Sequence, residues 1–245
     1  MEPVRAAPKL AGEPPEWLVQ DALTPCPYLP GQTARLPLRL PVRRLRPPEF
    51  AQRLQAGDRR QGALLYRPSC PTCRACEAIR IDVDLFAASR TQRRVVRRGD
   101  GLLQTEIGRP TLTREKVALY NRHKVERGLL TGNDLLDAGG YEQFLLETCT
   151  DTIELTYRCD RRLVGVAIAD RAADALSAVY CFYDPDYARF SPGTYSILKQ
   201  IELCRSWRLR HLYLGLYVAG SRSMRYKVNY RPHERLIAGA WRRFD

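Results

Sequence analysis

The sequence predicts an α+β protein whose C-terminal half contains a mixed sheet. Three β-rich runs follow one another at residues 153–159, 163–170 and 176–183, with short polar turns between them. Three strands in close succession predict an antiparallel meander. A helical pattern at 194–208 then leads to a β-rich run at 211–218, and a strand reached through a helix can lie parallel to the strand before it. These patterns together predict a sheet with antiparallel and parallel neighbours.

The charge of the chain indicates a polyanionic partner. The 245 residues suit one large domain or two small ones, and they carry a net charge of +13. An excess of this size favours nucleic acid as the partner. The alternative is a basic surface that serves solubility alone.

No apolar run is long enough to cross a bilayer, so no membrane contact is expected. Residues 1–20 carry charges and prolines without a hydrophobic stretch, which predicts a mobile tail and argues against a signal peptide. We therefore expect a cytoplasmic protein whose eight cysteines are reduced thiols or metal ligands.

The N-terminal elements are predicted to be short. Three prolines make residues 24–30 an extended or turning segment. Alternating apolar and basic residues predict a strand within 36–46, and Pro47 and Pro48 open a short helix that ends near Leu54. Residues 63–66 are predicted to form a strand that leads into a run of cysteines.

Cys70, Cys73 and Cys76 are spaced closely enough to serve one metal centre. Thiolates select zinc or an iron–sulfur cluster, and Cys26 is the fourth ligand we expect, because it also lies in a loop. A thiol cluster without metal is the alternative. The other cysteines fall in predicted helices or strands and are expected to fill core positions: Cys149, Cys159, Cys181 and Cys204.

A helix rich in arginine follows the cysteines. Ser89 and Gln92 form a capping-box pair at its start, and Gly99 stands where a C-cap glycine is expected. Helical spacing places five guanidinium groups on one face, opposite Val95 and Val96: Arg90, Arg93, Arg94, Arg97 and Arg98. Like charges on one face destabilise a helix, so this face predicts binding of phosphate or carboxylate groups. A solvated charged face is the alternative.

The remaining elements complete a three-part organisation. We expect a strand at 102–107, helices at 113–127 and 141–148, and a last strand at 237–244. The resulting boundaries are a tail at 1–20, a cysteine-bearing, metal-binding module at 21–110 and a C-terminal domain at 111–245, which its resemblance to acetyltransferases implies to be catalytic.

The β-β-β-α-β order resembles the fold of N-acetyltransferases (the GNAT fold). In that fold the loop before the helix holds a pyrophosphate. Here the loop offers Arg189 and Gly193 and lacks the rest of the glycine-rich pattern.

A second basic segment lies near the C-terminus. Arg225, Tyr226 and Lys227 combine cations with an aromatic ring, which suits binding of a carboxylate or phosphate and stacking on a base. An ordinary solvated surface loop is the alternative.

Five segments in order resemble motifs of one enzyme family: YRPSCPTCRACEAIRIDVDLFAASRTQRRVVRRG, SAVYCFYDP, SPGTYSILKQIEL, YLGLYV and MRYKVNYRPHE. The chain resembles the bacterial aspartate/glutamate leucyltransferases, which are relatives of the arginyl-tRNA–protein transferases. The resemblance implies transfer of leucine from Leu-tRNA to the α-amine of proteins that begin with Asp or Glu, which directs them to N-end-rule degradation.

The resemblance agrees with the residues. An aminoacyl ester is already activated, so the missing nucleophile motif is consistent with it, and no organic cofactor is expected. Tyr195 and Glu234 are candidates for orienting the acceptor amine or moving its proton. The alternatives are arginyl transfer from Arg-tRNA, a coenzyme-A-dependent N-acetyltransferase, and a non-catalytic zinc protein that binds RNA.

Overall fold

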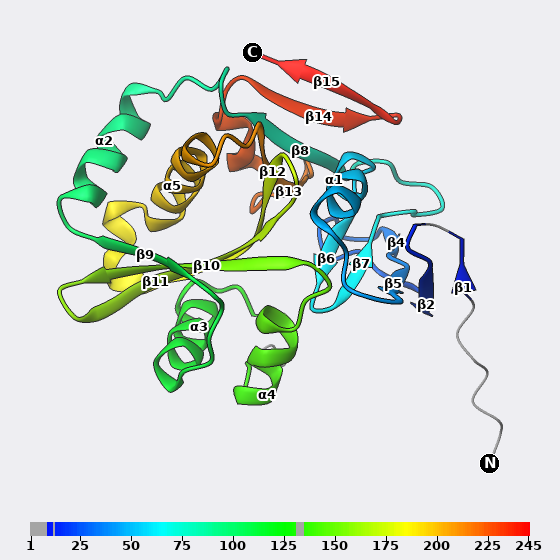
Figure 1. The fold of residues 1–245 in the computed structure, drawn as a ribbon, viewed down its shortest axis with the longest axis horizontal. Coiled ribbons are helices and arrows are strands. Elements are labelled where there is room, and N and C mark those ends of the chain that lie inside the picture. Colours follow the sequence, from blue (N-terminus) through cyan, green and yellow to red (C-terminus); the bar gives the residue numbers. More distant parts are fainter. Residues whose placement is uncertain (1–8, 12, 131–134) are drawn as a thin grey trace.

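The computed structural model describes residues 9–11, 13–130 and 135–245. Their largest element is an eight-stranded sheet (Figure 1). Its strands lie in the order β15 (Ala240–Phe244), β14 (His233–Ile237), β8 (Glu77–Asp82), β13 (His211–Tyr217), β12 (Ala175–Tyr183), β11 (Arg162–Arg171), β10 (Asp151–Cys159) and β9 (Gln104–Gly108).

Neighbouring strands of this sheet are antiparallel except β12 and β13, which are parallel. The helix α5 (Pro192–Ser206) connects those two strands. The predicted β-β-β-α-β order and its parallel pair are therefore confirmed. The predicted last strand is instead a hairpin of β14 and β15.

One face of the sheet is covered by α5 and by α2 (Arg90–Asp100), which pack on each other (Figure 1). Alternate residues of the strands point into this layer, among them Ile79 and Ile81 of β8 and Tyr157 of β10. Val95 and Val96 of α2 join the same cluster, so the arginines of α2 point outward, as predicted.

The opposite face carries α3 (Arg114–Glu126), α4 (Ala138–Tyr141) and the π-helical turn η1 (Glu142–Leu146). Tyr120 and Tyr141 pack there against Phe182 of β12. Within the residues that the structure describes, no helix is both long and apolar enough to cross a membrane.

The N-terminal part forms a second, five-stranded sheet, in the order β1 (Lys9–Leu10), β2 (Glu16–Gln20), β5 (Leu38–Pro41), β7 (Leu64–Tyr66) and β6 (Arg59–Gln61). The small hairpin of β3 (Leu23–Pro25) and β4 (Thr33–Arg35) lies beside it. Helix α1 (Pro47–Gln55) joins the two sheets through a cluster that contains Phe50, Leu65 and Tyr213.

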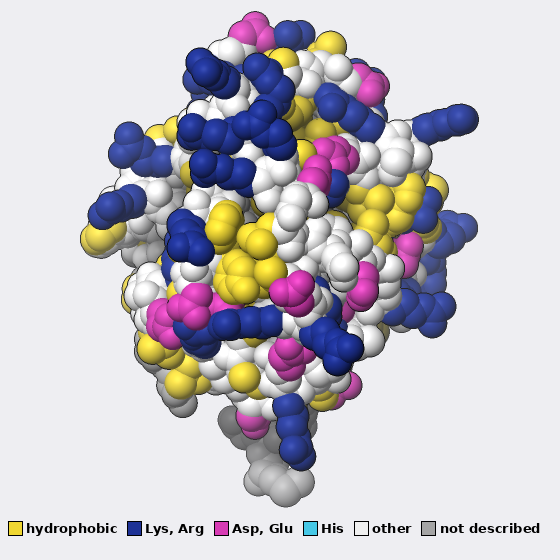
Figure 2. All heavy atoms as spheres, turned by 90° about the vertical axis from the view of Figure 1, so that its left-hand side faces the viewer, with side chains coloured by type: hydrophobic (Ala, Val, Ile, Leu, Met, Phe, Trp, Pro, Cys, Tyr) yellow, Lys and Arg dark blue, Asp and Glu magenta, His cyan; other side chains and the backbone are white. Residues whose placement is uncertain are grey.

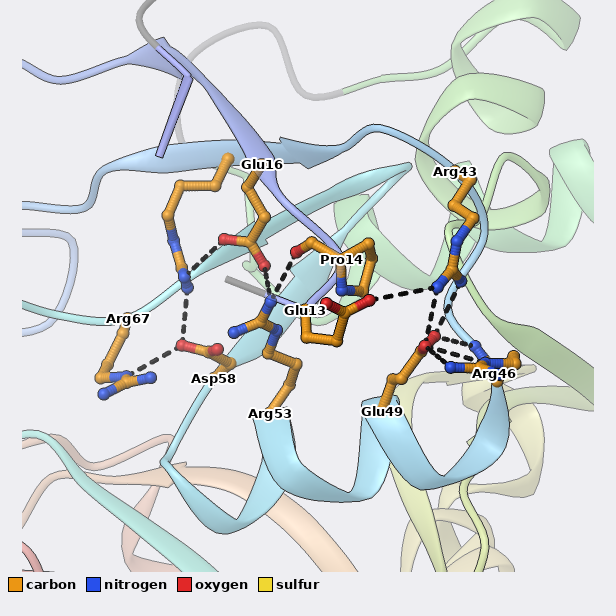
Figure 3. Close-up of polar contacts among 10 residues, drawn as sticks. Glu13, Pro14, Glu16, Arg43, Arg46, Glu49, Arg53, Asp58 and Arg67 are labelled. Carbon is orange, nitrogen blue, oxygen red and sulfur yellow. Dashed lines mark hydrogen bonds and ion pairs between the residues drawn. The ribbon is translucent and has the colours of Figure 1, made fainter. Parts of the chain in front are cut away.

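An ion-pair network holds β2 in place (Figure 3). Glu16 is 3% exposed and pairs with Arg39 at 2.8 Å and with Arg53 at 2.9 Å. Arg39 also reaches Asp58 at 2.6 Å. The expected tail over residues 1–20 is thus wrong at Glu16–Gln20, because strand pairing and buried charges fix this segment.

Two further expectations differ from the structure. Residue 110 does not separate the sheets, since β8 and β9 precede it and both belong to the eight-stranded sheet. Helix α2 does begin at the Ser89–Gln92 capping box, but it continues through Gly99 and ends with Gly101 as the C-cap.

Candidate active site

The parallel pair β12–β13 is joined over a short stretch only. The ladder consists of three residue pairs, of which Ser177–Tyr213 is the last, although β12 continues to Tyr183 and β13 to Tyr217. Beyond this point the two strands are not paired with each other. Their free edges can therefore bind side chains or a ligand in place of a neighbouring strand.

Arg59 of β6 lies at the point where the ladder ends. Its Nη1 donates to Ser177 Oγ at 2.9 Å, and its Nη2 donates to the carbonyl of Ala178 at 2.8 Å. A Cβ placed on Gly215 of β13 would lie 3.0 Å from Nη2 of Arg59. The guanidinium therefore contacts both strands, and Gly215 leaves the room that it needs.

Lys227 lies close by, on the 3-10 turn η3 (Arg225–Asn229). Its Nζ donates to the carbonyl of Leu216 at 2.6 Å and lies 3.2 Å from Met224 Sδ. Burial, and secondarily the charge on Arg59, lower the pKa of Lys227 to about 7. Lys227 is thus a buried amine beside a buried guanidinium, and it differs from the exposed Arg225 of the same turn.

Two tyrosine hydroxyls lie within the electrostatic reach of Arg59. Tyr226 is 47% exposed as a residue, yet local burial raises the pKa of its hydroxyl to about 12, and the charge on Arg59 opposes that rise. Burial also raises the pKa of Tyr28 well above its usual range, and Arg59 again opposes the rise. Both hydroxyls stay protonated at neutral pH and are within the electrostatic reach of Arg59, so both can donate hydrogen bonds.

The arginine face of α2 is exposed, and none of its five arginines forms an ion pair with a residue that the structure describes. Figure 2 views the molecule from this side and shows basic side chains gathered in its upper part. A pocket of about 430 Å³ lies between α2 and α5, with Arg93, Arg97, Asp100 and Glu202 in its wall. The face therefore presents unneutralised positive charge.

The structure does not bring Tyr195 and Glu234 together. Tyr195 is buried in the layer between α2 and α5, where its hydroxyl donates to Asp100 at 2.9 Å. Glu234 accepts from Arg80 at 2.6 Å, and Arg80 bonds to Gln55 of α1, on the other side of the sheet. In the folded chain both side chains have structural partners.

The four predicted metal ligands lie in two loops, Cys26 after β3 and the other three between β7 and β8. Burial raises the pKa of Cys76 to about 11, and the charges of Cys70, Cys26 and Cys73 add to the rise. Cys76 therefore lies within the electrostatic reach of the other three thiols. However, no three His, Cys, Asp or Glu side chains of the described residues are placed to hold a metal ion.

Sequence reasoning selected Lys227 and missed Arg59. Nothing in the local sequence distinguishes Arg59 from its neighbour Arg60, which pairs with Asp170 at 2.7 Å. The difference between them depends on a sheet whose strands come from distant parts of the chain.

Two family profiles match most of the chain. The profile described as "Arginine-tRNA-protein transferase, N terminus" matches residues 24–94, and the one described as its C terminus matches residues 115–237. The aspartate/glutamate leucyltransferase of Thiobacillus denitrificans is 37% identical over 236 residues, covering 95% of this chain and 98% of the relative. The protein of the same name from Methylorubrum populi is 40% identical over 241 residues, covering 91% and 94%.

Among solved structures, the chain is similar to one described as the C-terminal domain of a lysylphosphatidylglycerol synthetase from Agrobacterium fabrum. The TM-score is 0.51 at 14% identity, covering 66% of this chain and 59% of that chain. At this identity the similarity concerns the fold alone.

Proposed function

Because the chain belongs to the arginine-tRNA–protein transferase family, it is an aminoacyltransferase, and we propose that it moves leucine from Leu-tRNA to the α-amine of proteins that begin with Asp or Glu. The observation that carries this conclusion is the identity of 37–40% with leucyltransferases over nearly their whole length. The leucylated proteins then enter N-end-rule degradation.

The reaction does not require a nucleophile from the protein, because the aminoacyl ester is already activated. The acceptor amine attacks the ester carbonyl, a C–N bond forms, the bond to the ribose oxygen breaks, and the proton leaves the amine for that oxygen. The reference pKa of an α-amine is about 7.7–8.0, so a useful fraction is neutral near pH 7. Holding amine and ester together can then supply most of the acceleration.

The free edges of β12 and β13 are where we place the aminoacyl ester. Arg59 occupies the inner end of this region, at Ser177 and Ala178, and Lys227 bonds to β13 at Leu216. Both cations come from outside the two strands, one from the N-terminal sheet and one from η3. The site therefore combines parts of both halves of the chain.

The arginine face of α2 is where we place the tRNA backbone. Its guanidinium groups are exposed and have no acid partner among the described residues, so they can replace the counterions of phosphates. The net charge of +13 has the sign that such a partner requires. Arg225 and Tyr226 are exposed near the same site and can extend this contact to the end of the tRNA.

A transfer assay tests the function. Purified protein is mixed with labelled Leu-tRNA or Arg-tRNA and peptides that begin with Asp, Glu, Arg or Ala. We expect label to move from Leu-tRNA to the Asp and Glu peptides alone. Transfer of label from Arg-tRNA would show that Arg-tRNA is the donor, and the family assignment would stand. Saturable acetyl-CoA binding with acetyl transfer would favour an N-acetyltransferase, and tRNA binding without any transfer would favour a non-catalytic RNA-binding protein.

We also propose that Cys26, Cys70, Cys73 and Cys76 bind zinc or an iron–sulfur cluster after a small rearrangement of their loops. Four converging thiols are the donor set that such centres use, and metal binding would lower their pKa values and deprotonate them. Metal content of anaerobically purified protein, with the visible spectrum, measures this. We expect one centre per chain, lost in Cys73→Ser and kept in Cys159→Ser; protein without metal would contradict it.

A further inference from the structure

Arg59 and Lys227 are buried cations without an acid partner. They are 8% and 6% exposed, and neither forms an ion pair with a residue that the structure describes. Other buried cations do: Arg60 pairs with Asp170, and Lys116 pairs with Glu154. An uncompensated charge in the interior is costly, which indicates a site built for a negatively charged ligand.

The two cations also act on the same region. The guanidinium of Arg59 lies against Gly215 of β13, and Lys227 Nζ donates to the carbonyl of Leu216, the next residue, so the groups are close. A guanidinium has five N–H groups, and the bonds of Arg59 to Ser177 and Ala178 use two of them. Protonated Lys227 has three N–H groups, of which one donates to Leu216 and a second to Met224 Sδ. Donors remain for an incoming anion.

We propose that Arg59 and Lys227 bind the side-chain carboxylate of the first residue of the acceptor protein. This inference rests on the proposed function and names the residues that select its substrate. In an N-terminal Asp or Glu the carboxylate lies only a few bonds from the α-amine. Its binding site must therefore adjoin the place where the amine meets the ester, which is the free edge of β12 and β13.

Burial is what makes these two residues selective. An acceptor that begins with Asp differs from one that begins with Asn only in charge and one polar group. Exposed ion pairs contribute little because water and salt screen them, so the arginines of α2 discriminate poorly. Buried donors that lose their charged acceptor discriminate strongly. Tyr226, whose ring centroid lies 6.0 Å from Lys227 Nζ, offers a further hydroxyl donor.

Calorimetric peptide binding tests the site without relying on transfer. Peptides that begin with Asp or Asn, otherwise identical, are titrated into the full chain with and without deacylated tRNA. We expect wild type to bind the Asp peptide roughly 100-fold more tightly than the Asn peptide. Arg59→Met and Lys227→Met should each remove most of that ratio by weakening binding of the Asp peptide alone.

Controls separate selectivity from folding and from net charge. Arg222→Gln removes one exposed charge near the site and should leave the ratio unchanged. If thermal unfolding shows that Arg59→Met is not folded, Lys227→Met decides, since methionine fills the space of the lysine and removes its charge. A wild-type protein that binds both peptides equally, or folded variants that keep the full ratio, would overturn the inference. Selective binding without leucine transfer would uphold the site and reject the proposed reaction.

Discussion

Burial decides which of the 40 lysines and arginines in this chain can select a substrate. The α2 arginines are numerous and exposed, so their effect is long-ranged, unspecific and sensitive to salt. Arg59 and Lys227 are surrounded by protein, where the loss of a partner is expensive. In the proposed site the exposed residues attract a polyanion, and the buried ones recognise one carboxylate.

The lowered pKa of Lys227 predicts a pH-dependent stability. Folding lowers this pKa to about 7, whereas an unfolded lysine has a pKa of about 10.4. Between these values the unfolded chain binds the extra proton, so the contribution of Lys227 to stability rises with pH and is constant below about pH 7. Urea unfolding of wild type and Lys227→Met from pH 7 to 10 measures it. From pH 7 to 10 the free energy of unfolding of the wild type should rise by roughly a few kcal/mol relative to that of the variant. A difference between the two proteins that does not change with pH would contradict the lowered pKa.

At the scale of elements, a glycine sets how closely α2 packs on α5. A Cβ on Gly99 would lie 2.3 Å from the ring of Tyr195, closer than any real contact. Gly99→Ala should therefore destabilise the protein by about 1–3 kcal/mol, despite the better helix propensity of alanine. Gly101→Ala is the matched control, because the nearest atom to its Cβ lies 3.5 Å away. Equal midpoints of urea unfolding for both variants would show that Tyr195 can move aside.

The arginine face of α2 predicts a loss of function without a loss of fold. Arg94→Glu with Arg97→Glu reverses two exposed charges that have no ion-pair partner among the described residues. We expect tRNA binding to weaken by roughly 10-fold or more at low salt and leucine transfer to be abolished, with a flatter salt dependence. Arg242→Glu with Arg243→Glu on the exposed hairpin strand β15 makes the same change in net charge. Equal losses in both double variants would indicate net charge alone.

Local patterns in the sequence predict local structure well. The strands β10 to β13, helix α5 and the N-cap of α2 depend on periodicity and capping within a few residues, and their prediction is confirmed. The partners of Tyr195 and Glu234 depend on which face of the sheet each side chain lies on. Their partners Asp100 and Arg80 are more than 90 residues away in sequence, and no local pattern reports such contacts.

The same limit explains why the sequence predicted a domain boundary at residue 110 and did not indicate Arg59. The position of β8 between β13 and β14 is set by strands that follow it by over 100 residues. Arg59 reaches Ser177 and Ala178 across the junction between the sheets. The cationic character of the site could be predicted from composition, whereas the residues that carry it required the fold.

At the scale of the whole molecule, the two halves share one sheet and one site. Strand β8 bonds to β13 on one side and to β14 on the other, and β9 closes the far edge on β10. The N-terminal sheet also supplies Arg59 and places the cysteine loops near Tyr28, whose pKa is affected by both Cys76 and Arg59. The two halves therefore depend on each other structurally, although two separate family profiles match residues 24–94 and 115–237.

This sharing predicts that residues 111–245 do not form an independent catalyst. A fragment that begins at residue 111 lacks β8, so the edges of β13 and β14 lose their common neighbour, and the buried face that Ile79 and Ile81 fill is left open. We expect the fragment to unfold without a cooperative transition and to transfer no leucine. Residues 1–110 supplied as a second chain should restore both properties, because they return β8 and Arg59 together. In the complemented pair, Arg59→Met in the first fragment should restore folding without the preference for Asp over Asn. A fragment 111–245 that folds cooperatively and transfers leucine on its own would show that the shared sheet is not required.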